Sequence, residues 1–394
     1  MLDLILVIPW YIVLFAQANY VTITMMYKRT RYFHFLGLFV FGLLAVIALG
    51  ATLIPFIPSK QWYIRIFDYP RLQTFFIAVS ALLWYSFFYF KKGRQGYVFA
   101  IMFMAVIIVQ GYKAWPYTPF SKKQVLWAEQ NGKDTTAISL LICNVLQTNT
   151  SYNKVLEKVK KYNPDILITT ESDSTWQNKL SDLNTSYPYR IPIPLSNTYG
   201  MHLYSRFALK ETKVRFLLEA DIPSIRTRVQ LTSGEWITIF VVHPRPPVPG
   251  EADDSRERDA EIIMVAREAR KESGGVIVAG DFNDVAWSET TELFQEVTGY
   301  LDPRRGRGFY NTFHAEFPVF RWPLDHIFHS SHFKLMKLQR VERVNSDHYP
   351  MFVQLNYIPE EKKDQPKVKP DDDTEKDASE TIQKGRTDAD APDK

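Results

Sequence analysis

Hydrophobic and polar positions divide this chain into three stretches of different character. The first 115 residues are almost continuously apolar, the middle stretch alternates short apolar runs with amphipathic segments, and the last 36 residues are almost entirely polar. We therefore predict a membrane region at 1–115, a linker at 116–135, a folded domain at 136–358 and a charged tail at 359–394. The tail has too little apolar content to offset the entropy lost on ordering, so we expect it to be disordered.

The membrane region contains four apolar runs, at 2–26, 33–57, 75–90 and 97–115. A membrane span needs roughly 20 apolar residues, and these runs reach or approach that length. The first run is the weakest, because it carries Asp3 and has a signal-like segment as its alternative. We expect about four helices and a multi-pass protein of the cell inner or plasma membrane. A buried helical bundle in a soluble protein is the other interpretation.

Basic residues indicate how such helices would be oriented. Two tight basic clusters, at 28–31 and 91–94, lie on one side of the membrane if all four runs cross it. Because cytoplasmic loops are enriched in Lys and Arg, this arrangement places everything after residue 115 outside the cytoplasm. The opposite side also carries basic residues, so the bias is one of density rather than number.

The stretch from 136 to 358 has the pattern of a layered α/β domain. Helical stretches near 155–159 and 255–272 separate short apolar runs that are typical of strands. Such alternation favours a fold in which helices cover sheets, and the stretch is long enough to bury its own core. The expected strands lie at 137–145, 164–172, 200–206, 227–231, 235–244, 276–279, 324–330, 337–343 and 346–355.

Charge and cysteine content narrow the choice of function. The formal charge is only +4 over 394 residues, which argues against a general nucleic-acid-coating protein but leaves room for a local basic groove. Cys143 is the only cysteine, so the chain forms no internal disulfide and offers no cysteine-based zinc site. One cysteine does not indicate whether the protein works in an oxidising or a reducing compartment.

Polar residues of one chemical kind gather at the ends of the expected strands. Any single one is more often a cap or a turn residue than a ligand, but agreement among six strand ends is improbable by chance. Carboxylates and amides are the hard oxygen ligands that Mg²⁺ or Mn²⁺ prefers, and histidine beside aspartate suits acid–base chemistry. The set predicts attack on a phosphoester and comprises Asn144, Glu171, His243, Asp281, Asn283, Asp325, Asp347 and His348.

Six motifs in this order, LLICNV, PDILITTES, HP, GDFND, LDHIF and SDHYP, resemble the endonuclease/exonuclease/phosphatase superfamily. The resemblance covers about residues 136–356, and the combination of GDFN with SDH is its most specific part. The apolar leader followed by this domain looks like the bacterial membrane-associated branch. The resemblance implies an α/β fold, a four-layered α/β sandwich in which two mostly antiparallel sheets lie between helices.

The resemblance also implies a metal site and a phosphate site. It assigns Mg²⁺ or Mn²⁺ to Asn144, Glu171 and Asp347, with Glu171 as the principal carboxylate. Asp281 corresponds to the acid that orients or deprotonates the attacking water. Asn283 corresponds to the amide that holds the phosphate.

Three further residues acquire catalytic roles from the same resemblance. His348 corresponds to the essential histidine that contacts the phosphoryl oxygens or activates water. Asp325 is the partner that fixes its tautomer. His243 corresponds to a second histidine that protonates the leaving oxygen in many members.

Four other residues are weaker candidates for binding the substrate. His202 lies in an expected strand and either lines the site or fills a strand face. Arg226, Arg228 and Arg245 either bind an anionic substrate or form surface ion pairs. The basic loop 304–308 and the histidines at 326, 329 and 332 are interpreted as solvated and structural, respectively.

The leading hypothesis is a membrane-anchored, divalent-metal-dependent phosphodiesterase. Its substrate is nucleic acid or a lipid head group, and its other expected partner is the bilayer; no protein partner is inferable. Short loops and few available arginines weigh against nucleic acid. A catalytically silent receptor or scaffold is the alternative, disfavoured because every chemical position is filled.

Overall fold

The computed structural model describes residues 3–88, 94–129 and 134–389, which form two compact units. The first unit comprises residues up to Leu53 together with Leu72–Gln110. The second comprises Ile54–Arg71 and the chain from Gly111 onwards. The segment Ile54–Arg71, although it lies between two helices of the first unit in the sequence, therefore belongs to the second.

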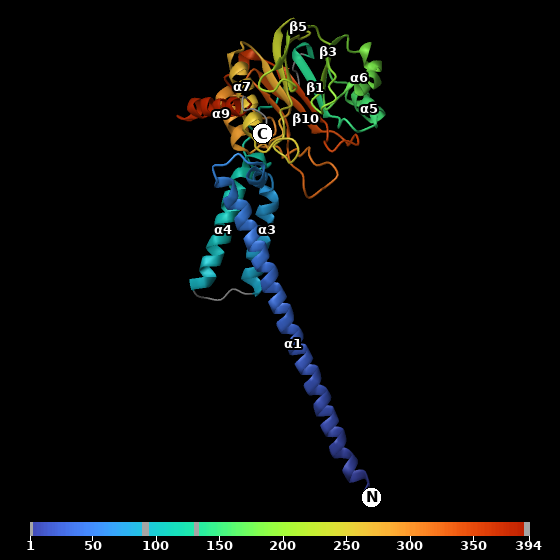
Figure 1. Cartoon of the computed structure of the whole chain (residues 1–394), viewed down its shortest axis with the longest axis vertical. Helices are drawn as coiled ribbons and strands as arrows, with labels where there is room; N and C mark the ends of the chain where they lie inside the picture. The colour runs from blue at the N-terminus through green and yellow to red at the C-terminus, as the bar shows by residue number, and fades with distance from the viewer. Residues whose placement is uncertain (1–2, 89–93, 130–133, 390–394) are drawn as a thin grey trace. The chain divides into compact units, whose positions relative to one another are not determined.

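The first unit contains fewer helices than the four apolar runs predicted. The first two runs form one continuous helix, α1 (Asp3–Leu53), followed by α3 (Arg71–Phe88) and α4 (Arg94–Ala114), as Figure 1 shows. The prediction of separate helices was wrong because residues 27–32 contain no Gly or Pro, and Lys and Arg continue a helix readily. At 1.5 Å per residue the 51 residues of α1 extend roughly 77 Å.

Two helical stretches in the described chain are long and apolar enough to cross a membrane, Phe35–Phe56 and Tyr97–Tyr117. The expected orientation depended on a connection between the first two runs, and α1 has no such connection. Within the first unit, small and aromatic side chains form the helix contacts, including Ala48 and Phe103.

The second unit contains two sheets of mostly antiparallel strands. In the larger sheet the order is β10-β11-β1-β2-β4-β3, and only β1 and β2 are parallel. Its strands are β1 (Ala137–Asn144), β2 (Ile166–Thr170), β3 (Tyr189–Ile193), β4 (Met201–Ser205), β10 (Phe333–Arg340) and β11 (Met351–Tyr357).

The smaller sheet repeats this plan. Its order is β5-β6-β7-β8-β9, and only β7 and β8 are parallel. Its strands are β5 (Leu209–Phe216), β6 (Pro223–Gln230), β7 (Trp236–Val242), β8 (Val276–Asp281) and β9 (Asp325–His329).

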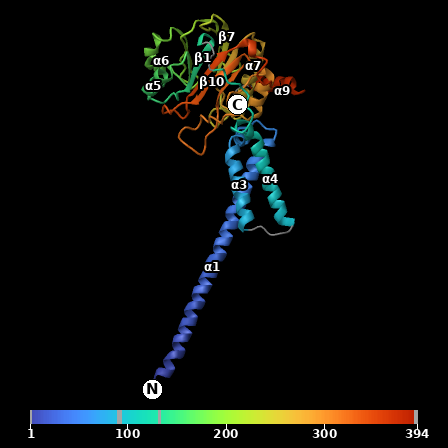
Figure 2. The same ribbon diagram turned by 180° about the vertical axis from the view of Figure 1, so that it is seen from behind.

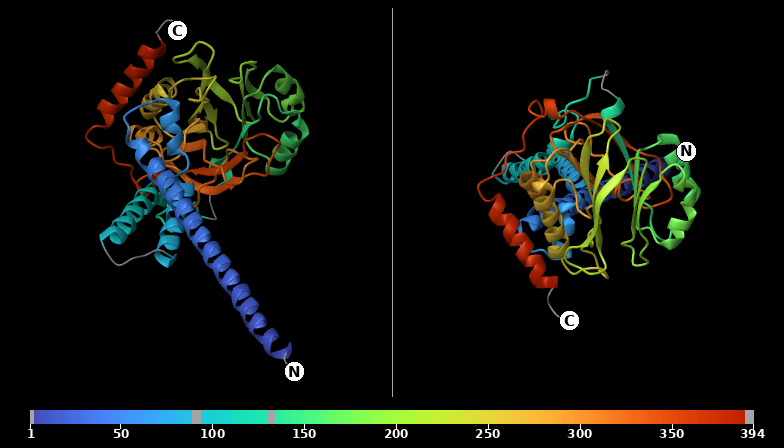
Figure 3. Two further views of the ribbon diagram at one scale, coloured as in Figure 1. Left: turned by 60° about the horizontal axis from the view of Figure 1, so that its bottom comes forward. Right: turned by 90° about the horizontal axis from the view of Figure 1, so that it is seen from above.

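The two sheets face each other, and helices cover their outer faces (Figures 2 and 3). Strand residues alternate between layers: Leu140 and Ile142 enter the core between the sheets, whereas Leu141 packs in the outer cluster with Trp176 of α6. The predicted four-layered sandwich is thus confirmed. The covering helices are α5 (Tyr152–Tyr162), α6 (Ser174–Lys179), α7 (Arg256–Lys271), α8 (Glu289–Thr298) and α9 (Thr374–Ala389).

The predicted disorder of the tail is wrong for α9. Ala378 and Ile382 are buried in the cluster formed with α7 and the outer face of the smaller sheet. Gly385 permits the close approach, because a Cβ there would lie 2.3 Å from the Cβ of Ala260. Ala378 and Ile382 form an apolar stripe on α9 that is too narrow to be recognised in a polar sequence. It is nevertheless sufficient to pack the helix once α7 provides an apolar surface.

The segment Ile54–Arg71 is folded against the second unit. The Lys60 ammonium lies 3.2 Å from the Asp259 carboxylate, and the indole nitrogen of Trp287 donates a hydrogen bond to the carbonyl of Asp68. The predicted linker also contributes, since Tyr117 is buried and its hydroxyl donates to the carbonyl of Ala286. The second unit is therefore assembled from segments that are distant in the sequence.

Candidate active site

The two parallel strand pairs supply the centre of the site. Asn144 ends β1, Glu171 follows β2, His243 follows β7 and Asp281 ends β8. Parallel neighbours end at the same edge of a sheet, so each pair delivers two polar side chains to one place. Because the two sheets face each other, all four side chains enter one buried region.

Unusual backbone geometry accompanies this convergence. Gly280 has φ +141°, and a Cβ on it would lie 2.0 Å from the carbonyl oxygen of Val242 on β7. Glu171 and Asn283 also have positive φ, of 54° and 51°. Non-glycine residues adopt this left-handed backbone conformation only where their surroundings impose it, often at functional sites.

Asn144 connects two carboxylates that come from different sheets. Its side-chain nitrogen donates to Oε1 of Glu171 at 2.7 Å and to Oδ2 of Asp281 at 3.0 Å. Its side-chain oxygen accepts from the backbone nitrogen of Leu146. Asn144 therefore fixes the separation of Glu171 and Asp281.

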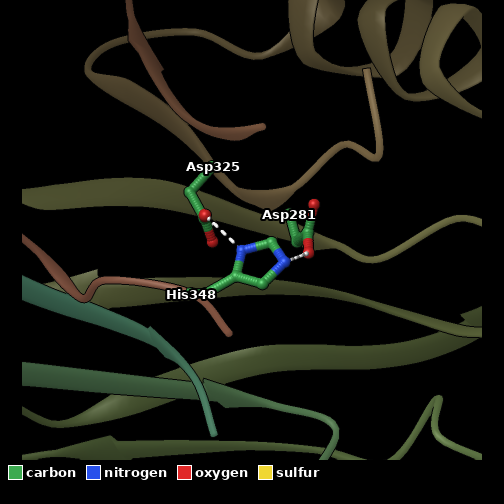
Figure 4. A group of neighbouring side chains, drawn as sticks. All are labelled: Asp281, Asp325 and His348. Atoms are coloured by element: carbon green, nitrogen blue, oxygen red, sulfur yellow. Dashed lines mark hydrogen bonds and ion pairs between the residues drawn. The ribbon is translucent and has the colours of Figure 1, made fainter. Parts of the chain in front are cut away.

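His348 lies between two aspartates, as Figure 4 shows. Its Nδ1 is 2.7 Å from Oδ2 of Asp325, and its Nε2 is 3.5 Å from Oδ2 of Asp281. Asp325 is the first residue of β9 and pairs in register with Asp281 on β8. Adjacent antiparallel strands thus place the two carboxylates on opposite sides of the ring.

This arrangement favours the protonated histidine. Burial alone would lower the pKa of His348, but the carboxylates of Asp325 and Asp281 raise it to about 10. Burial would raise the pKa of Asp281, but the charged His348 ring and the hydrogen bonds from the Asn283 backbone and the Asn144 amide hold it below its usual value. At neutral pH the site therefore contains an imidazolium beside an ionised Asp281.

Glu171 holds a proton more readily than an ordinary glutamate. Burial raises its pKa to about 7, Asp347 and Asp281 add to the effect, and the Asn144 hydrogen bond opposes it. Asp347 is partly exposed and accepts a hydrogen bond from Ser346. Several carboxylates crowded together with one imidazolium leave an excess of negative charge.

That excess fits a divalent cation. Glu171 and Asp347 offer anionic oxygens, the ligands that Mg²⁺ and Mn²⁺ prefer. Asp281, Asp325 and His348 form another compact group, with ligand atoms within 4.8 Å of one another. Either group could hold a cation, and the Glu171 side could do so while His348 is protonated, since a protonated ring has no lone pair to give.

His243 contributes a neutral ring. Burial lowers its pKa, and its Nε2 lies 4.0 Å from Oδ2 of Asp281. Its Nδ1 has no hydrogen-bond partner among the described residues. The Tyr199 ring packs beside it, with ring centres 5.4 Å apart.

Comparison with known proteins identifies the family of the chain. Residues 141–348 match the profile of the Endonuclease/Exonuclease/phosphatase family, which is more than half of the chain. The chain belongs to this family. Its activity class is that of a metal-dependent phosphoric ester hydrolase acting on phosphoester substrates.

Solved structures with a similar fold have low sequence identity to the chain. D. rerio TDP2 complexed with single strand DNA product has 17% identity and a TM-score of 0.47, over 56% of this chain and 99% of that one. The human Nocturnin catalytic domain with bound sulfate has 20% identity and a TM-score of 0.45, over 56% and 95%. A family protein from Bacteroides vulgatus has 16% and 0.45, over 56% and 99%. No curated protein sequence matched.

The four weaker candidates are each engaged with neighbouring side chains. Arg226 pairs with Glu272, Arg228 with Glu211, and Arg245 with Glu219. His202 is buried on β4, with Nδ1 2.7 Å from the hydroxyl of Ser172, and lines a separate cavity of about 240 Å³ with Tyr204. Their predicted role in substrate binding gains no support from these contacts.

Two residues that sequence reasoning missed support Asn283. Its carbonyl accepts hydrogen bonds from the Tyr69 hydroxyl at 3.1 Å and from the Arg258 guanidinium at 2.7 Å. The Asn283 side-chain nitrogen donates to the carbonyl of Pro244, and its backbone nitrogen to Asp281. Tyr69 lay in the predicted membrane region and Arg258 in a polar helix, so neither gave a local signal.

The predicted solvated loop 304–308 is wrong at its first residue. Arg304 is buried, pairs with Asp302 and contacts Nδ1 of His326 at 2.8 Å. Opposite charges and carbonyls satisfy the guanidinium, which permits its burial. His326 also lies 2.9 Å from the carbonyl of Asp284, in agreement with its structural interpretation.

Proposed function

We propose that this family member is a membrane-anchored phosphodiesterase that depends on Mg²⁺ or Mn²⁺. One observation carries the proposal: Asn144 joins Glu171 to Asp281, and Asp281 in turn faces His348. Cation-binding and acid–base groups are thus parts of one connected pocket. A structural ion-pair network would not need two backbone positions in the left-handed region at Glu171 and Asn283.

Asp281 is the group that accepts or orients the proton of the attacking water. It is ionised at neutral pH, and its Oδ1 is held by the backbone nitrogen of Asn283. Its other oxygen faces the Asn144 amide and the two histidine rings. A buried, fixed carboxylate needs little reorganisation when the water loses its proton.

The remaining groups bind the phosphoryl oxygens. His348 supplies a cation, held in one tautomer by Asp325. Asn283 uses one side-chain N–H for the carbonyl of Pro244, and the amide has a second for a phosphate oxygen. His243 provides an N–H for the leaving oxygen. The cation at Glu171 and Asp347 would neutralise charge that develops on the phosphoryl group.

The substrate we propose is a phosphodiester without a long nucleic-acid track. Arg226, Arg228 and Arg245 are each paired with a carboxylate in the described structure. Arginines paired in this way are not available as a row of phosphate contacts, on which nucleic-acid affinity depends. A lipid head group requires only the local site.

Activity of the full chain in detergent micelles tests the proposal. We expect hydrolysis of bis(p-nitrophenyl) phosphate with Mg²⁺ or Mn²⁺ and its loss with a chelator. Asp281→Asn and His348→Ala should each lower kcat by at least about 10²–10³-fold. The matched control is Asp221→Asn, at a largely exposed carboxylate outside the pocket. Retained turnover in either site variant would overturn the roles, and no turnover on any diester would favour a silent receptor.

We further propose that Phe35–Phe56 and Tyr97–Tyr117 anchor the chain in the inner or plasma membrane, that α3 between them returns the chain across the bilayer, and that the catalytic unit lies outside the cytoplasm. Lys28, Arg29 and Arg31 precede the first of these stretches, and the sequence 91–94 precedes the second. By the positive-inside rule both beginnings are cytoplasmic. A reporter fused after Lys394 tests the orientation, and a cytoplasmic signal would refute it.

A further inference from the structure

A hairpin at Thr312–Trp322 lies directly beside the catalytic histidine. The backbone nitrogens of Thr312 and Phe313 donate to the carbonyl of Trp322, and that of His314 donates to the carbonyl of Phe320. Phe313 also forms a backbone bridge with His348, and their rings are centred 4.9 Å apart. Figures 1 and 2 draw this part of the chain as an orange loop extending from the sheets.

The tip of this hairpin exposes apolar side chains to an unusual degree. Phe317 and Phe320 are each 56% exposed, and Val319 is 66% exposed. With the exposed Pro318 they form four consecutive apolar residues at the surface. A run of this kind is unfavourable in water unless another apolar phase covers it.

The base of the hairpin is cationic. The Arg321 and Arg340 guanidinium groups lie over the ring of Tyr349, at 5.1 and 4.5 Å from its centre. Neither forms an ion pair with any residue that the structure describes, whereas Arg343 pairs with Glu316. An apolar tip with arginines behind it matches the boundary between acyl chains and anionic head groups.

We propose that the hairpin tip, Phe317–Phe320, inserts into an anionic phospholipid bilayer and that Arg321 and Arg340 contact lipid phosphates. The occupant we propose is the membrane in which, on the proposed function, the apolar stretches Phe35–Phe56 and Tyr97–Tyr117 anchor the chain. Because Phe313 links the hairpin to His348, the inserted tip holds the site at the lipid surface. Resting on the proposed function, this inference makes the substrate a membrane lipid phosphodiester.

Insertion is measured directly with a spin label on the full chain in nanodiscs that contain anionic phospholipid. Cys143 is buried and is replaced by alanine, after which Phe320→Cys carries the only label. We expect the label at 320 to collide more with dissolved oxygen than with an aqueous nickel chelate. The control is Val214→Cys on β5, where 41% of the side chain is exposed and the reverse preference is expected. If the label at 320 collides with the nickel chelate as readily as the label at 214 does, the proposal is wrong. This holds even if the label at 320 is immobilised, because a protein partner could then be covering the tip in place of lipid.

The same measurement separates this inference from the catalytic proposal. In a His348→Ala background, insertion is expected to persist although hydrolysis is lost. For the active chain, Phe317→Ser with Phe320→Ser should lower the ratio of turnover on nanodisc phospholipid to turnover on bis(p-nitrophenyl) phosphate by at least tenfold. An unchanged ratio would show that the tip does not deliver lipid to the site.

Discussion

Replacing Asp325 with asparagine is the most informative perturbation of the site. The carboxylate lies 2.7 Å from Nδ1 of His348 and is the larger of the two anionic influences that raise the pKa of this histidine. Asparagine keeps the size of the side chain and removes the charge. It also brings an N–H that competes with the Nδ1 proton of the ring.

The structure sets the scale of the effect. The difference between the ordinary pKa of 6.5 and about 10 corresponds to roughly 5 kcal/mol in favour of the protonated ring. Removing one of two nearby carboxylates should lower the pKa of His348 by roughly 1–3. Loss of the charge and of the tautomer should lower kcat at neutral pH by about 10²–10⁴-fold, as in other histidine–aspartate pairs.

Stability should follow the same titration. A pKa that is higher in the folded state contributes stability that is fully present below pH 6.5 and is lost as pH rises through about 10. For Asp325→Asn we expect this loss to begin at lower pH. Urea unfolding between pH 6 and 10 measures the window, and ¹⁵N-histidine NMR measures the pKa.

The pH profile of kcat and the histidine titration test whether Asp325 sets the charge of His348, with Asp221→Asn as the control. An unchanged profile and an unchanged titration in Asp325→Asn would show that Asp325 does not set the charge of His348. In that case the imidazolium assignment, and the role built on it, would be wrong.

Three further outcomes are expected. Glu171 has a pKa of about 7, so its proton competes with the cation, and the Mg²⁺ concentration for half-maximal activity should fall as pH rises from 6 to 8. Glu171→Gln should remove this pH dependence. If the dependence persists in the variant, the cation is bound elsewhere. Tyr69→Phe deletes one hydrogen bond to Asn283 and should lower kcat severalfold while costing only roughly 0.5–1.5 kcal/mol in urea unfolding; unchanged kinetics would make Tyr69 merely structural. Ile382→Ala in α9 should cost roughly 2–4 kcal/mol, measured against the exposed Lys384→Ala; equal stability of the two would mean that α9 does not pack in solution.

The sequence predicted the strand ends that carry the polar residues better than it predicted their surroundings. Asn144 and Asp281 each end a short apolar run, so the strand pattern itself located them. By contrast, β3 and β5 were missed because both are edge strands with polar or interrupted sequences, and edge strands lack the buried alternation that makes a strand recognisable. The missed strands do not alter the strand ends that form the pocket.

Contacts across long sequence separations explain the other differences. Tyr69 and Asn283 are 214 residues apart, and no local periodicity indicates that they meet. Arg304 is polar in every local context, and only the carboxylate of Asp302 makes its burial possible. For α9, two buried residues in a charged sequence become a packing stripe only when α7 is present.

The position of Ile54–Arg71 inside the catalytic unit has a consequence for biosynthesis. Tyr69 leaves the ribosome 214 residues before its partner Asn283, and at typical translation rates the interval is roughly 10–40 s. During that time residues 259–287, which supply the partners of Lys60 and of the Asp68 carbonyl, have not yet been synthesised. The segment Ile54–Arg71 therefore cannot form these contacts until they appear. The chain therefore completes its hydrolase only after nearly all of it has been synthesised.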